Sequence, residues 1–560
     1  MTGGHLAGDE GFAARMFLRS GGRSAEDVRR RPVIGICTSW SELNPCNSSL
    51  AELANAVKQG VHDSGGLGLV FGTISLSEAL VRPTTMLLRN LMSMDVEEMI
   101  NASPIDGVVL LYGCDKTVAA QLMGATSANK PAVGLGAGPR KVGSWQGAPV
   151  TIDDSWRFID QRRTGQLDDT QWQDLEGSIC PSSGVCNVLG TATTLAMIAE
   201  VLGFALPGSS LVESGSAGHA ELAHRTGVAA VRAAHECTLP TQNVTRRGLL
   251  DAWRLVCAIG GSTNAAVHLL ALAGRAGVPL TLDDLEGVGA RTPTLVNVKP
   301  NGPLDLADLH AEGGVAAVMR ELSGQVDLDR QTADGRTWRE VVSALPPAAH
   351  RAVLPASRPL SPVGALAVLH GSLAPRGAVI KRSAATPELL RHVGRAVVFD
   401  GVADLRARID DPELDVDATS VLVLRGCGPI GGGMPEAGAI PIPAKLYAQG
   451  IRDMVRITDA RMSGTAAGTV ILHVAPESAV GGPLALVRDG DEIEIDVAEG
   501  RLDLLVDHAA LAGRSHQGNA DPPPRGYGWL HHQHVMQADT GCDFDFLRDA
   551  TTREIPEGAA

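Results

Sequence analysis

The 560-residue sequence lacks clustered Lys and Arg, and its formal net charge at pH 7 is −15. Because phosphate backbones are bound by clustered basic side chains, this charge balance argues against a nucleic-acid-binding protein. Aromatic residues make up only 3% of the chain, and no long low-complexity tract indicates disorder. A chain of this length exceeds the size at which one hydrophobic core stops growing, so we expect at least two globular domains.

Long apolar runs are also missing. No segment reaches the roughly 18 uninterrupted apolar residues of a membrane span, and Met1 to Phe17 has no continuous apolar core of the kind that signal peptides carry. We therefore expect a cytoplasmic protein that is neither exported nor membrane-bound. The nine cysteines are an odd number scattered along the chain, which favours reduced thiols, some of them metal ligands, over a disulfide framework.

The first two-thirds of the chain alternate short apolar runs with helical patterns. Pro32 to Cys37 and Gly107 to Tyr112 are typical of buried strands, and Thr85 to Ile100 is predicted to be an amphipathic helix. Its predicted apolar face consists of Leu87, Leu88, Leu91, Met94 and Met99. The fold class is therefore α/β, with a parallel sheet covered by helices on both faces.

A proline-rich segment without clear periodicity, Leu345 to Pro362, is the predicted connection between an N-terminal domain (1–362) and a C-terminal domain (363–560). Beyond it, short β-branched runs alternate with Gly-rich turns, which predicts a mostly β domain containing a barrel. The predicted strands are Ser420 to Arg425, Met454 to Thr458, Thr469 to Val474 and Glu492 to Val497.

Three cysteines stand in loops where a ligand is expected. Cys46 follows the first predicted strand, Cys114 follows the strand that ends at Tyr112, and Cys186 precedes a helical run. The carboxyl ends of parallel strands and the N-termini of helices are where open α/β sheets bind ligands and stabilise thiolates. Three thiolates leave one iron of a cluster without a fourth protein ligand, as a Lewis-acid catalyst requires.

Carboxylates near these cysteines suit a magnesium ion. Asp115 and Lys116 directly follow Cys114, while Glu78 and Glu436 lie in the segments SLSEAL and GGGMPEAG. Taken alone, each carboxylate is more simply interpreted as a surface charge.

Ser463 and Thr465 lie in RITDARMSGTAAG, between two predicted strands. A serine in such a place acts as a base or nucleophile if a nearby cation lowers its pKa, although most Ser-Gly pairs are only turns.

Other motifs receive no catalytic assignment. The glycines of GCGPIGGGMPE lack the Lys-Ser/Thr ending of a P-loop and the strand–helix context of a dinucleotide fingerprint. The run His531 to His534 is interpreted as packing or interface rather than as a metal site. Cys180 is ambiguous, and the remaining cysteines are interpreted as small buried residues; they are Cys37, Cys237, Cys257, Cys427 and Cys542.

In this order the motifs resemble the family that joins the dihydroxyacid dehydratases and the sugar-acid dehydratases, nearly from end to end. The matching segments are RPVIGICTSWSELNPCN, RPTTMLLRNLMSMDVEEMI, DGVVLLYGCDKT, GVCNVLGTATTLAMIAE, GGSTNAAVHLLALA, LAPRGAVIK, GGGMPEAG, DARMSGTAAGTVILHVAPES and GGPLALVRDGDEIEID. Within the family, RPTTMLLRNLMSMDVEE and RGYGWLHHQHVMQADTGCDFDFL resemble the sugar-acid branch.

The resemblance implies a role for each candidate residue. It implies a [2Fe-2S] cluster held by Cys46, Cys114 and Cys186. It implies Mg²⁺ held by Glu78, Asp115, Glu436 and a carbamylated Lys116, with Ser463 as an alkoxide base beside Thr465. It also implies an N-terminal α/β domain, a C-terminal domain containing a β-barrel, and assembly as a homodimer or homotetramer.

The chain departs from the family pattern at two places. Ser48, Ser49 and Leu50 stand where the family commonly has a histidine, and Ser372 replaces the usual asparagine of a GNLAP segment. Neither departure removes an implied ligand.

The expected activity is that of a hydro-lyase that removes water from a sugar acid, a pentonate in the first instance, to give a 2-keto-3-deoxy acid. Two alternatives stay open: a dihydroxyacid dehydratase of branched-chain amino-acid biosynthesis, and a non-enzymatic iron–sulfur redox sensor.

Overall fold

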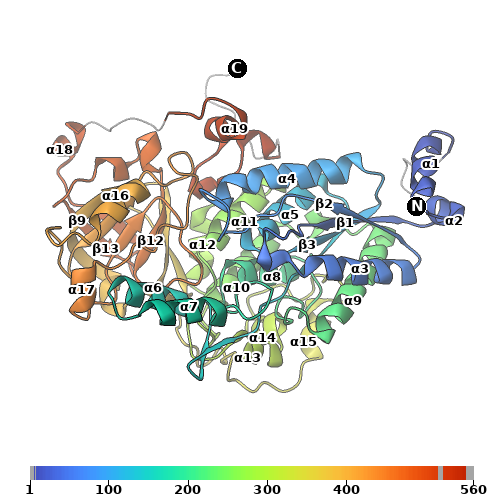
Figure 1. Ribbon diagram of the computed structural model, residues 1–560, viewed down its shortest axis with the longest axis horizontal. Helices are drawn as coiled ribbons and strands as arrows, with labels where there is room; N and C mark the ends of the chain where they lie inside the picture. Colours follow the sequence, from blue (N-terminus) through green and yellow to red (C-terminus); the bar gives the residue numbers. More distant parts are fainter. Residues whose placement is uncertain (1–5, 7, 515–520, 550–560) are drawn as a thin grey trace.

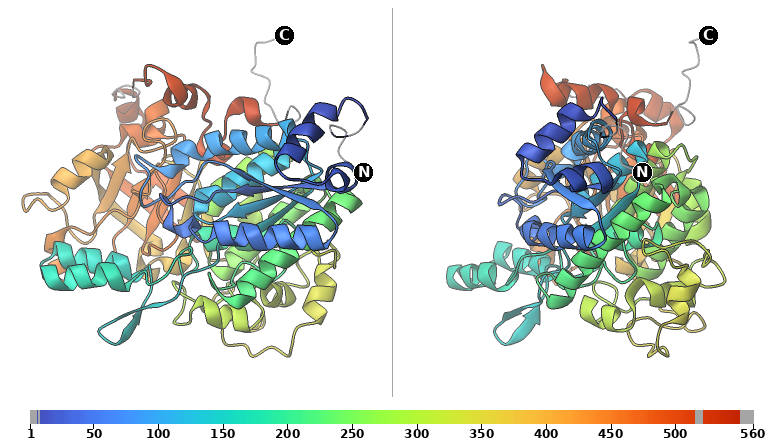
Figure 2. Two further views of the ribbon diagram at one scale, coloured as in Figure 1. Left: turned by 45° about the vertical axis from the view of Figure 1, so that its right-hand side comes forward. Right: turned by 90° about the vertical axis from the view of Figure 1, so that its right-hand side faces the viewer.

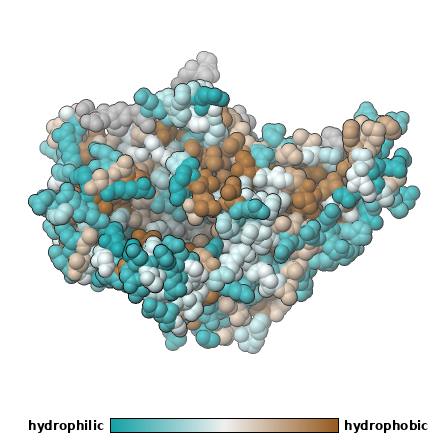
Figure 3. Space-filling model, viewed as in Figure 1, coloured by the Kyte–Doolittle hydropathy of each residue, from teal (hydrophilic) through white to brown (hydrophobic). Residues whose placement is uncertain are grey.

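The computed structural model describes residues 6, 8–514 and 521–549, so part of the segment Met1 to Phe17 lies outside the described residues. The chain forms two lobes that lie side by side, with the N-terminal half in one and most of the C-terminal third in the other (Figure 1). Apolar residues gather on the middle of the face seen in Figure 3, in the region between the lobes. Across the described ranges, no helix has both the length and the apolar character needed to cross a membrane.

The N-terminal lobe is built on a four-stranded parallel sheet of order β2-β1-β3-β4. Alternate side chains of its central strands enter two cores: Ile34 and Val109 pack toward α3 and α9, while Val33 and Val108 lie in the core that includes α4 and α5. The sheet is therefore buried on both faces, as its continuous apolar strands predict. The strands are β1 (Val33–Thr38), β2 (Leu67–Gly72), β3 (Gly107–Tyr112) and β4 (Ala132–Gly136), with a small hairpin of β5 (Gly143–Trp145) and β6 (Ala148–Val150).

Helices surround this sheet and extend below it (Figures 1 and 2). They are α1 (Phe12–Ser20), α2 (Ala25–Arg30), α3 (Leu50–Asp63), α4 (Thr85–Ala102), α5 (Asp115–Ala128), α6 (Asp154–Arg163), α7 (Asp169–Ser178), α8 (Thr191–Val201), α9 (Ala217–Glu236), α10 (Arg246–Ile259), α11 (Asn264–Arg275), α12 (Leu282–Gly289), α13 (Leu306–Ala311), α14 (Gly314–Glu321) and α15 (Trp338–Ser343). Helices α6 and α7 lie beneath the C-terminal lobe in both views, and Arg163 of α6 donates to the carbonyl of Ile442 at 2.5 Å.

The C-terminal lobe is an eight-stranded sheet of order β14-β13-β9-β10-β11-β12-β8-β7. Its two edges meet where the His370 amide donates to the Gly500 carbonyl and the Leu502 amide donates to the His370 carbonyl, both at 2.8 Å. The sheet is therefore nearly closed, and its interior is filled by β-branched and aliphatic side chains such as Ile380, Val423 and Ile471.

Its strands are β7 (Leu366–Leu369), β8 (Gly377–Lys381), β9 (Arg391–Asp400), β10 (Val421–Arg425), β11 (Arg456–Thr458), β12 (Val470–Ala475), β13 (Glu492–Asp496) and β14 (Arg501–Leu504). The accompanying helices are α16 (Gly401–Arg408), α17 (Ala444–Ala448), α18 (His508–Ala512) and α19 (Gly526–His534).

The fold class and the predicted strands are confirmed, but two predictions about burial are wrong. Helix α4 forms where predicted, yet the predicted apolar face is only partly buried, whereas the polar side chains of Arg89, Asn90 and Ser93 are fully buried. Cys237, interpreted as a buried residue, is exposed, because it takes the left-handed position at the end of α9 with φ of 53°. The segment predicted as the domain connection contains no helix or strand and pairs with 294–296 through Val353 and Ser361.

The polar face of α4 is buried because the C-terminal segment docks on it. Arg89 donates to the carbonyls of Gly541 and Cys542 at 2.9 and 2.7 Å. Arg275 of α11 binds both carboxylate oxygens of Asp543, at 2.5 and 3.1 Å, and both side chains are buried. The histidine run lies on α19, where His531 packs between Tyr527 and Phe544, as a packing role requires.

Removing one partner of this buried pair should destabilise the protein. We expect Asp543→Ala to lower the free energy of unfolding by about 3–5 kcal/mol, because it leaves the Arg275 guanidinium buried without its main counter-charge. Asp415→Ala is the matched control, since Asp415 pairs with Arg395 at 3.3 Å but is 87% exposed; it should cost at most about 1 kcal/mol. Calorimetric unfolding of both variants checks this, and equal melting temperatures would contradict it.

Candidate active site

Cys114 lies where the central strand β3 passes into helix α5. It is the N-cap residue of α5, followed at once by Asp115 and Lys116, and all three are buried. Its amide donates to Asn47 Oδ1 at 2.8 Å, and Asn47 Nδ2 donates to the Ser39 carbonyl at 2.9 Å. Asn47 therefore ties this loop to the turn that carries Cys46.

The two loops approach each other too closely for a side chain at Gly113. A Cβ atom at Gly113 would lie 2.2 Å from Asn47 Oδ1 and 2.9 Å from the Cys46 carbonyl oxygen. A hydrogen bond with Cys114 lowers the pKa of Cys46 to about 7, with the charge of Arg140 also lowering it against the effect of burial. The same contact raises the pKa of Cys114, so one thiolate is favoured between the two.

Cys186 joins this pair through Arg140. Arg140 Nη2 lies 3.5 Å from Cys46 Sγ and donates to the Gly184 carbonyl at 2.7 Å, in the loop that leads to Cys186. Burial and the nearby charge of Cys46 raise the pKa of Cys186 to about 12. Burial lowers the pKa of Arg140, but interactions with the surrounding cysteines outweigh that effect and raise it; they are Cys46, Cys180 and Cys186.

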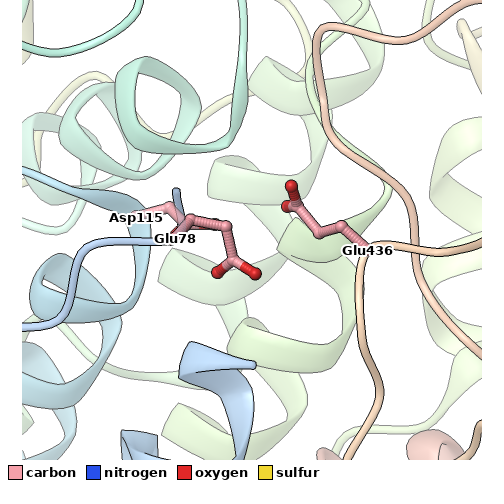
Figure 4. A group of neighbouring side chains, drawn as sticks. All are labelled: Glu78, Asp115 and Glu436. Carbon is pink, nitrogen blue, oxygen red and sulfur yellow. The ribbon is translucent and has the colours of Figure 1, made fainter. Parts of the chain in front are cut away.

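Carboxylates from both lobes converge beside these cysteines. Figure 4 shows Glu78 and Asp115 from the N-terminal lobe facing Glu436 from the C-terminal lobe, and one oxygen of each lies within 4.8 Å of the others. Such a group offers the hard oxygen ligands that Mg²⁺ prefers. The predicted carboxylates are thus brought together, although more than 300 residues separate Asp115 from Glu436.

Two buried cations accompany the carboxylates. Arg461 donates to Glu436 Oε1 and to Glu78 Oε1, each at 2.6 Å, and Lys116 Nζ pairs with Asp115. Burial raises the pKa of Glu78, but Arg461 and Lys116 outweigh it and lower the value to about 2. Burial raises the pKa of Glu436 to about 7; Arg461 opposes this change, and the charges of Glu78 and Asp115 add to it. The two cations thus favour the charged form of Glu78, while burial and the neighbouring carboxylates disfavour the charged form of Glu436.

Ser463 lies two residues after Arg461, in the loop before β12. Its Oγ is 2.9 Å from Thr465 Oγ1, which accepts a hydrogen bond from Trp156 Nε1 at 2.9 Å. An indole N–H can only donate, so Thr465 keeps its own proton free to donate to Ser463. A hydrogen bond donated by Thr465 stabilises negative charge on Ser463 Oγ.

Backbone contacts hold this loop against the cysteine loop. A Cβ at Gly464 would lie 2.7 Å from the amide nitrogen of Thr191, and one at Gly190 would lie 3.2 Å from Thr465 Cγ2 and 3.8 Å from Cys186 Cβ. Asn264, the first residue of α11, donates to the Met462 carbonyl at 3.2 Å. Glycine is therefore needed where the two lobes meet.

Sequence reasoning missed several residues of this site. Arg461 and Asn47 belong to the motifs DARMSG and PCN that were already singled out, so their proximity to Ser463 and Cys46 was an available signal. Trp156 and Arg140 lie in segments without such a motif, and no local pattern marks them.

The two departures from the family pattern lie outside the carboxylate group. Ser49 is the N-cap residue of α3, 3.4 Å from Ser214 Oγ. Ser372 accepts from the Leu504 amide at 2.9 Å at the seam of the barrel, so it serves the closure of the sheet.

Comparison with known proteins identifies the family to which these motifs belong. Residues 31–341 match the model of the dihydroxy-acid/6-phosphogluconate dehydratase N-terminal domain, and residues 351–542 match that of the C-terminal domain. The chain is 43% identical over 544 residues to 6-deoxy-6-sulfo-D-gluconate dehydratase of Pseudomonas putida, covering 96% of this chain and 94% of that protein.

Two further relatives represent both branches of the family. L-arabonate dehydratase of Azospirillum brasilense is 44% identical over 560 residues, covering 98% of this chain and 96% of that protein. A dihydroxy-acid dehydratase of Mycobacterium tuberculosis is 38% identical over 533 residues, covering 92% of each chain. The resemblance predicted from the motifs is confirmed, and the chain belongs to the dihydroxy-acid/6-phosphogluconate dehydratase family of hydro-lyases.

Proposed function

We propose that this protein dehydrates a sugar acid, a pentonate in the first instance, to its 2-keto-3-deoxy acid. The observation that carries the proposal is the position of the 461–465 segment: Arg461 binds carboxylates of both lobes, while Thr465 lies against the loop of Cys186. A base on Ser463 therefore stands between a group of carboxylates and a group of thiols. The homo-oligomeric state, as a homodimer or homotetramer in the cytoplasm, is part of this proposal.

The residues present fit the two metal groups that the family implies. Glu78, Asp115 and Glu436 would hold Mg²⁺, and Cys46, Cys114 and Cys186 would hold the [2Fe-2S] cluster. Lys116 would join the magnesium ligands only as a carbamate, because an ammonium group has no lone pair. When bound, the two groups supply Lewis acidity that makes the C2 proton more acidic and the C3 hydroxyl a better leaving group.

The protein side chains supply the proton transfer. Ser463 Oγ accepts the C2 proton of the substrate, and Thr465 stabilises the negative charge on Ser463 by donating a hydrogen bond to it. Trp156 fixes the orientation of Thr465. Loss of the C3 hydroxyl as water leaves an enol, which tautomerises to the 2-keto-3-deoxy acid.

Turnover of a substrate panel tests the proposal. Anaerobically purified protein with iron, sulfide and Mg²⁺ restored should form 2-keto-3-deoxy product from one or more pentonates or hexonates. Ser463→Ala should reduce kcat by about 10²–10⁴-fold, the usual contribution of a positioned base. Ser323→Ala, at an exposed position after α14, is the matched control. Turnover of 2,3-dihydroxyisovalerate alone would indicate the branched-chain pathway instead, and absence of turnover with an intact cluster would favour a redox sensor.

Binding of Mg²⁺ tests the carboxylate group separately. We expect Glu436→Gln to weaken Mg²⁺ binding by at least about tenfold, because an amide replaces one anionic oxygen ligand. Isothermal titration of MgCl₂ into the anaerobic protein measures this, with Glu176→Gln on exposed α7 as the control. Equal affinities of Glu436→Gln and the unmodified protein would remove Glu436 from the site.

A further inference from the structure

The glycine-rich segment 426–436, the glycine loop, follows strand β10 and ends at Glu436. Backbone amides of such a loop can form a concave site for an anion. The loop lacks the sequence of a phosphate-binding motif, and in the structure its amides bind two carboxylates of the same chain. These are Glu477 and Asp459, both of which are 0% exposed.

Glu477 binds the middle of the glycine loop. Its Oε1 accepts a hydrogen bond from the Ile430 amide at 2.9 Å, and its Oε2 accepts one from the Gly431 amide at 2.9 Å. Gln537 Nε2 donates to Glu477 Oε1 at 2.7 Å, and the Glu477 amide donates to Gln537 Oε1 at 2.8 Å. The carboxylate therefore joins the glycine loop to the C-terminal segment that docks on α4.

The contact leaves no room for a side chain at Gly428. A Cβ atom there would lie 2.4 Å from Glu477 Oε2 and 2.5 Å from Glu477 Cβ. The Gly428 carbonyl in turn accepts hydrogen bonds from the amides of Gly432 and Met434, at 3.0 and 3.1 Å. Met434 is fully buried and precedes Glu436 by two residues. A series of contacts thus leads from the Glu477 carboxylate to the backbone that carries Glu436.

Asp459 binds the start of the glycine loop. Its Oδ1 accepts from the Cys427 amide at 2.9 Å, and its Oδ2 accepts from the amide and hydroxyl of Ser478 at 3.0 and 2.6 Å. Arg461, two residues after Asp459, donates to Glu436 Oε1 at 2.6 Å. The short segment 459–461 therefore contacts both ends of the glycine loop.

Glu477 binds the loop through charge-assisted hydrogen bonds. In the described chain its donors are two backbone amides and the Gln537 side-chain amide, and none of them carries a charge. Burial raises the pKa of Glu477 to about 7, and the bonds from the glycine loop and from Gln537 oppose that rise. These bonds favour the charged form of the carboxylate, and they are strongest in that form. Glu477 therefore restrains the loop more firmly than a neutral side chain would.

We propose that Glu477 is a positioning residue that holds the glycine loop so that Glu436 faces Glu78 and Asp115, as in Figure 4. This inference rests on the proposed role of Glu436 as a ligand of Mg²⁺. Glu477 acts through the backbone of the loop and is not itself a ligand. Its replacement should leave the ligand residues in place and disturb their geometry.

Hydrogen exchange of the anaerobic protein before Mg²⁺ is added tests the restraint on the loop. Glu477→Gln keeps the size of the side chain but replaces one acceptor oxygen by a donor. We expect peptides covering 426–434 to take up deuterium at least about tenfold faster in this variant, because charge-assisted bonds to two amides are lost. Peptides from β13 should exchange as before. An unchanged rate in 426–434 would overturn the proposal.

Affinity for Mg²⁺ tests the consequence for Glu436. Isothermal titration of MgCl₂ should give a Kd about 10–100-fold higher for Glu477→Gln, the usual effect of removing a group that orients a metal ligand. Glu413→Gln, at an exposed position before β10, is the matched control and should bind Mg²⁺ as the unmodified protein does. Equal Kd values for Glu477→Gln and the control would contradict the positioning role.

Gly428→Ala tests the same contact from the loop side, and it serves also if Glu477→Gln does not fold. Its Cβ should displace the Glu477 carboxylate and weaken Mg²⁺ binding, whereas Gly177→Ala on α7, where a Cβ meets no atom within 4 Å, should not. Gln537→Met removes the bond to the C-terminal segment but leaves those to the loop, so it should change the Kd less than Glu477→Gln does. An equal change would assign the role to the C-terminal segment instead.

The outcomes separate this proposal from the one on which it rests. If Glu436→Gln binds Mg²⁺ as the unmodified protein does, Glu436 is not a ligand and the role of Glu477 fails with it. If Glu436→Gln loses affinity while Glu477→Gln and Gly428→Ala keep it, the positioning role alone is overturned. Faster exchange of Glu477→Gln in every peptide, those of β13 included, would show that Glu477 only stabilises the fold.

Discussion

The site depends on one buried guanidinium. Arg461 is 2% exposed and pairs with Glu78 of one lobe and Glu436 of the other, each at 2.6 Å. Charges removed from water must be paired with good geometry, and here one guanidinium pairs with a carboxylate from each lobe. The same residue sets the position of Ser463, which follows it by two residues. The Arg461 side chain therefore links the position of the Ser463 loop to that of the carboxylate group.

Glycine allows the other contacts across the junction. The backbones at Gly464 and Gly113 come so close to Thr191 and Asn47 that a Cβ atom would overlap them. Close approach of this kind fixes the position of one segment against the other, because a backbone in contact cannot adjust as a long side chain can. The serine loop is thereby set against the start of α8 by a backbone contact, while the Asn47 side chain links the turn that carries Cys46 to the loop of Cys114.

Most of the fold was predictable because the sequence patterns that specify its strands are local. The apolar run of β3 and the β-branched runs of β10 and β12 specify strands by themselves. The buried face of α4 was not predictable in this way, because Arg89 and Asn90 are buried by a segment that begins more than 400 residues later. Exposure of Cys237 has a similar cause: residue type favours burial, but the left-handed end of α9 directs the chain outward.

The residues of the candidate site also differ in whether local sequence marks them. Cysteines and carboxylates in recognisable motifs could be selected from sequence, since their residue types match metal chemistry. The residues that orient them could not, because Trp156 reaches Thr465 from a helix 309 positions away and Arg140 reaches Cys46 from 94 positions away. Tertiary structure alone brings such partners together.

Unsatisfied polar atoms add a further argument about where ligands bind. Both ring nitrogens of the buried His473 lack partners in the described chain, as do His268 Nε2 and Asn264 Oδ1. Burial lowers the pKa of His473 to about 3, with the charges of Arg461 and Lys116 adding to that effect, so the ring is neutral. Buried polar groups are normally hydrogen-bonded, and the unpaired nitrogens of His268 and His473 both lie near Arg461 and Lys116. A hydroxyl-rich acid, the substrate class proposed above, offers donors and acceptors that such atoms can use.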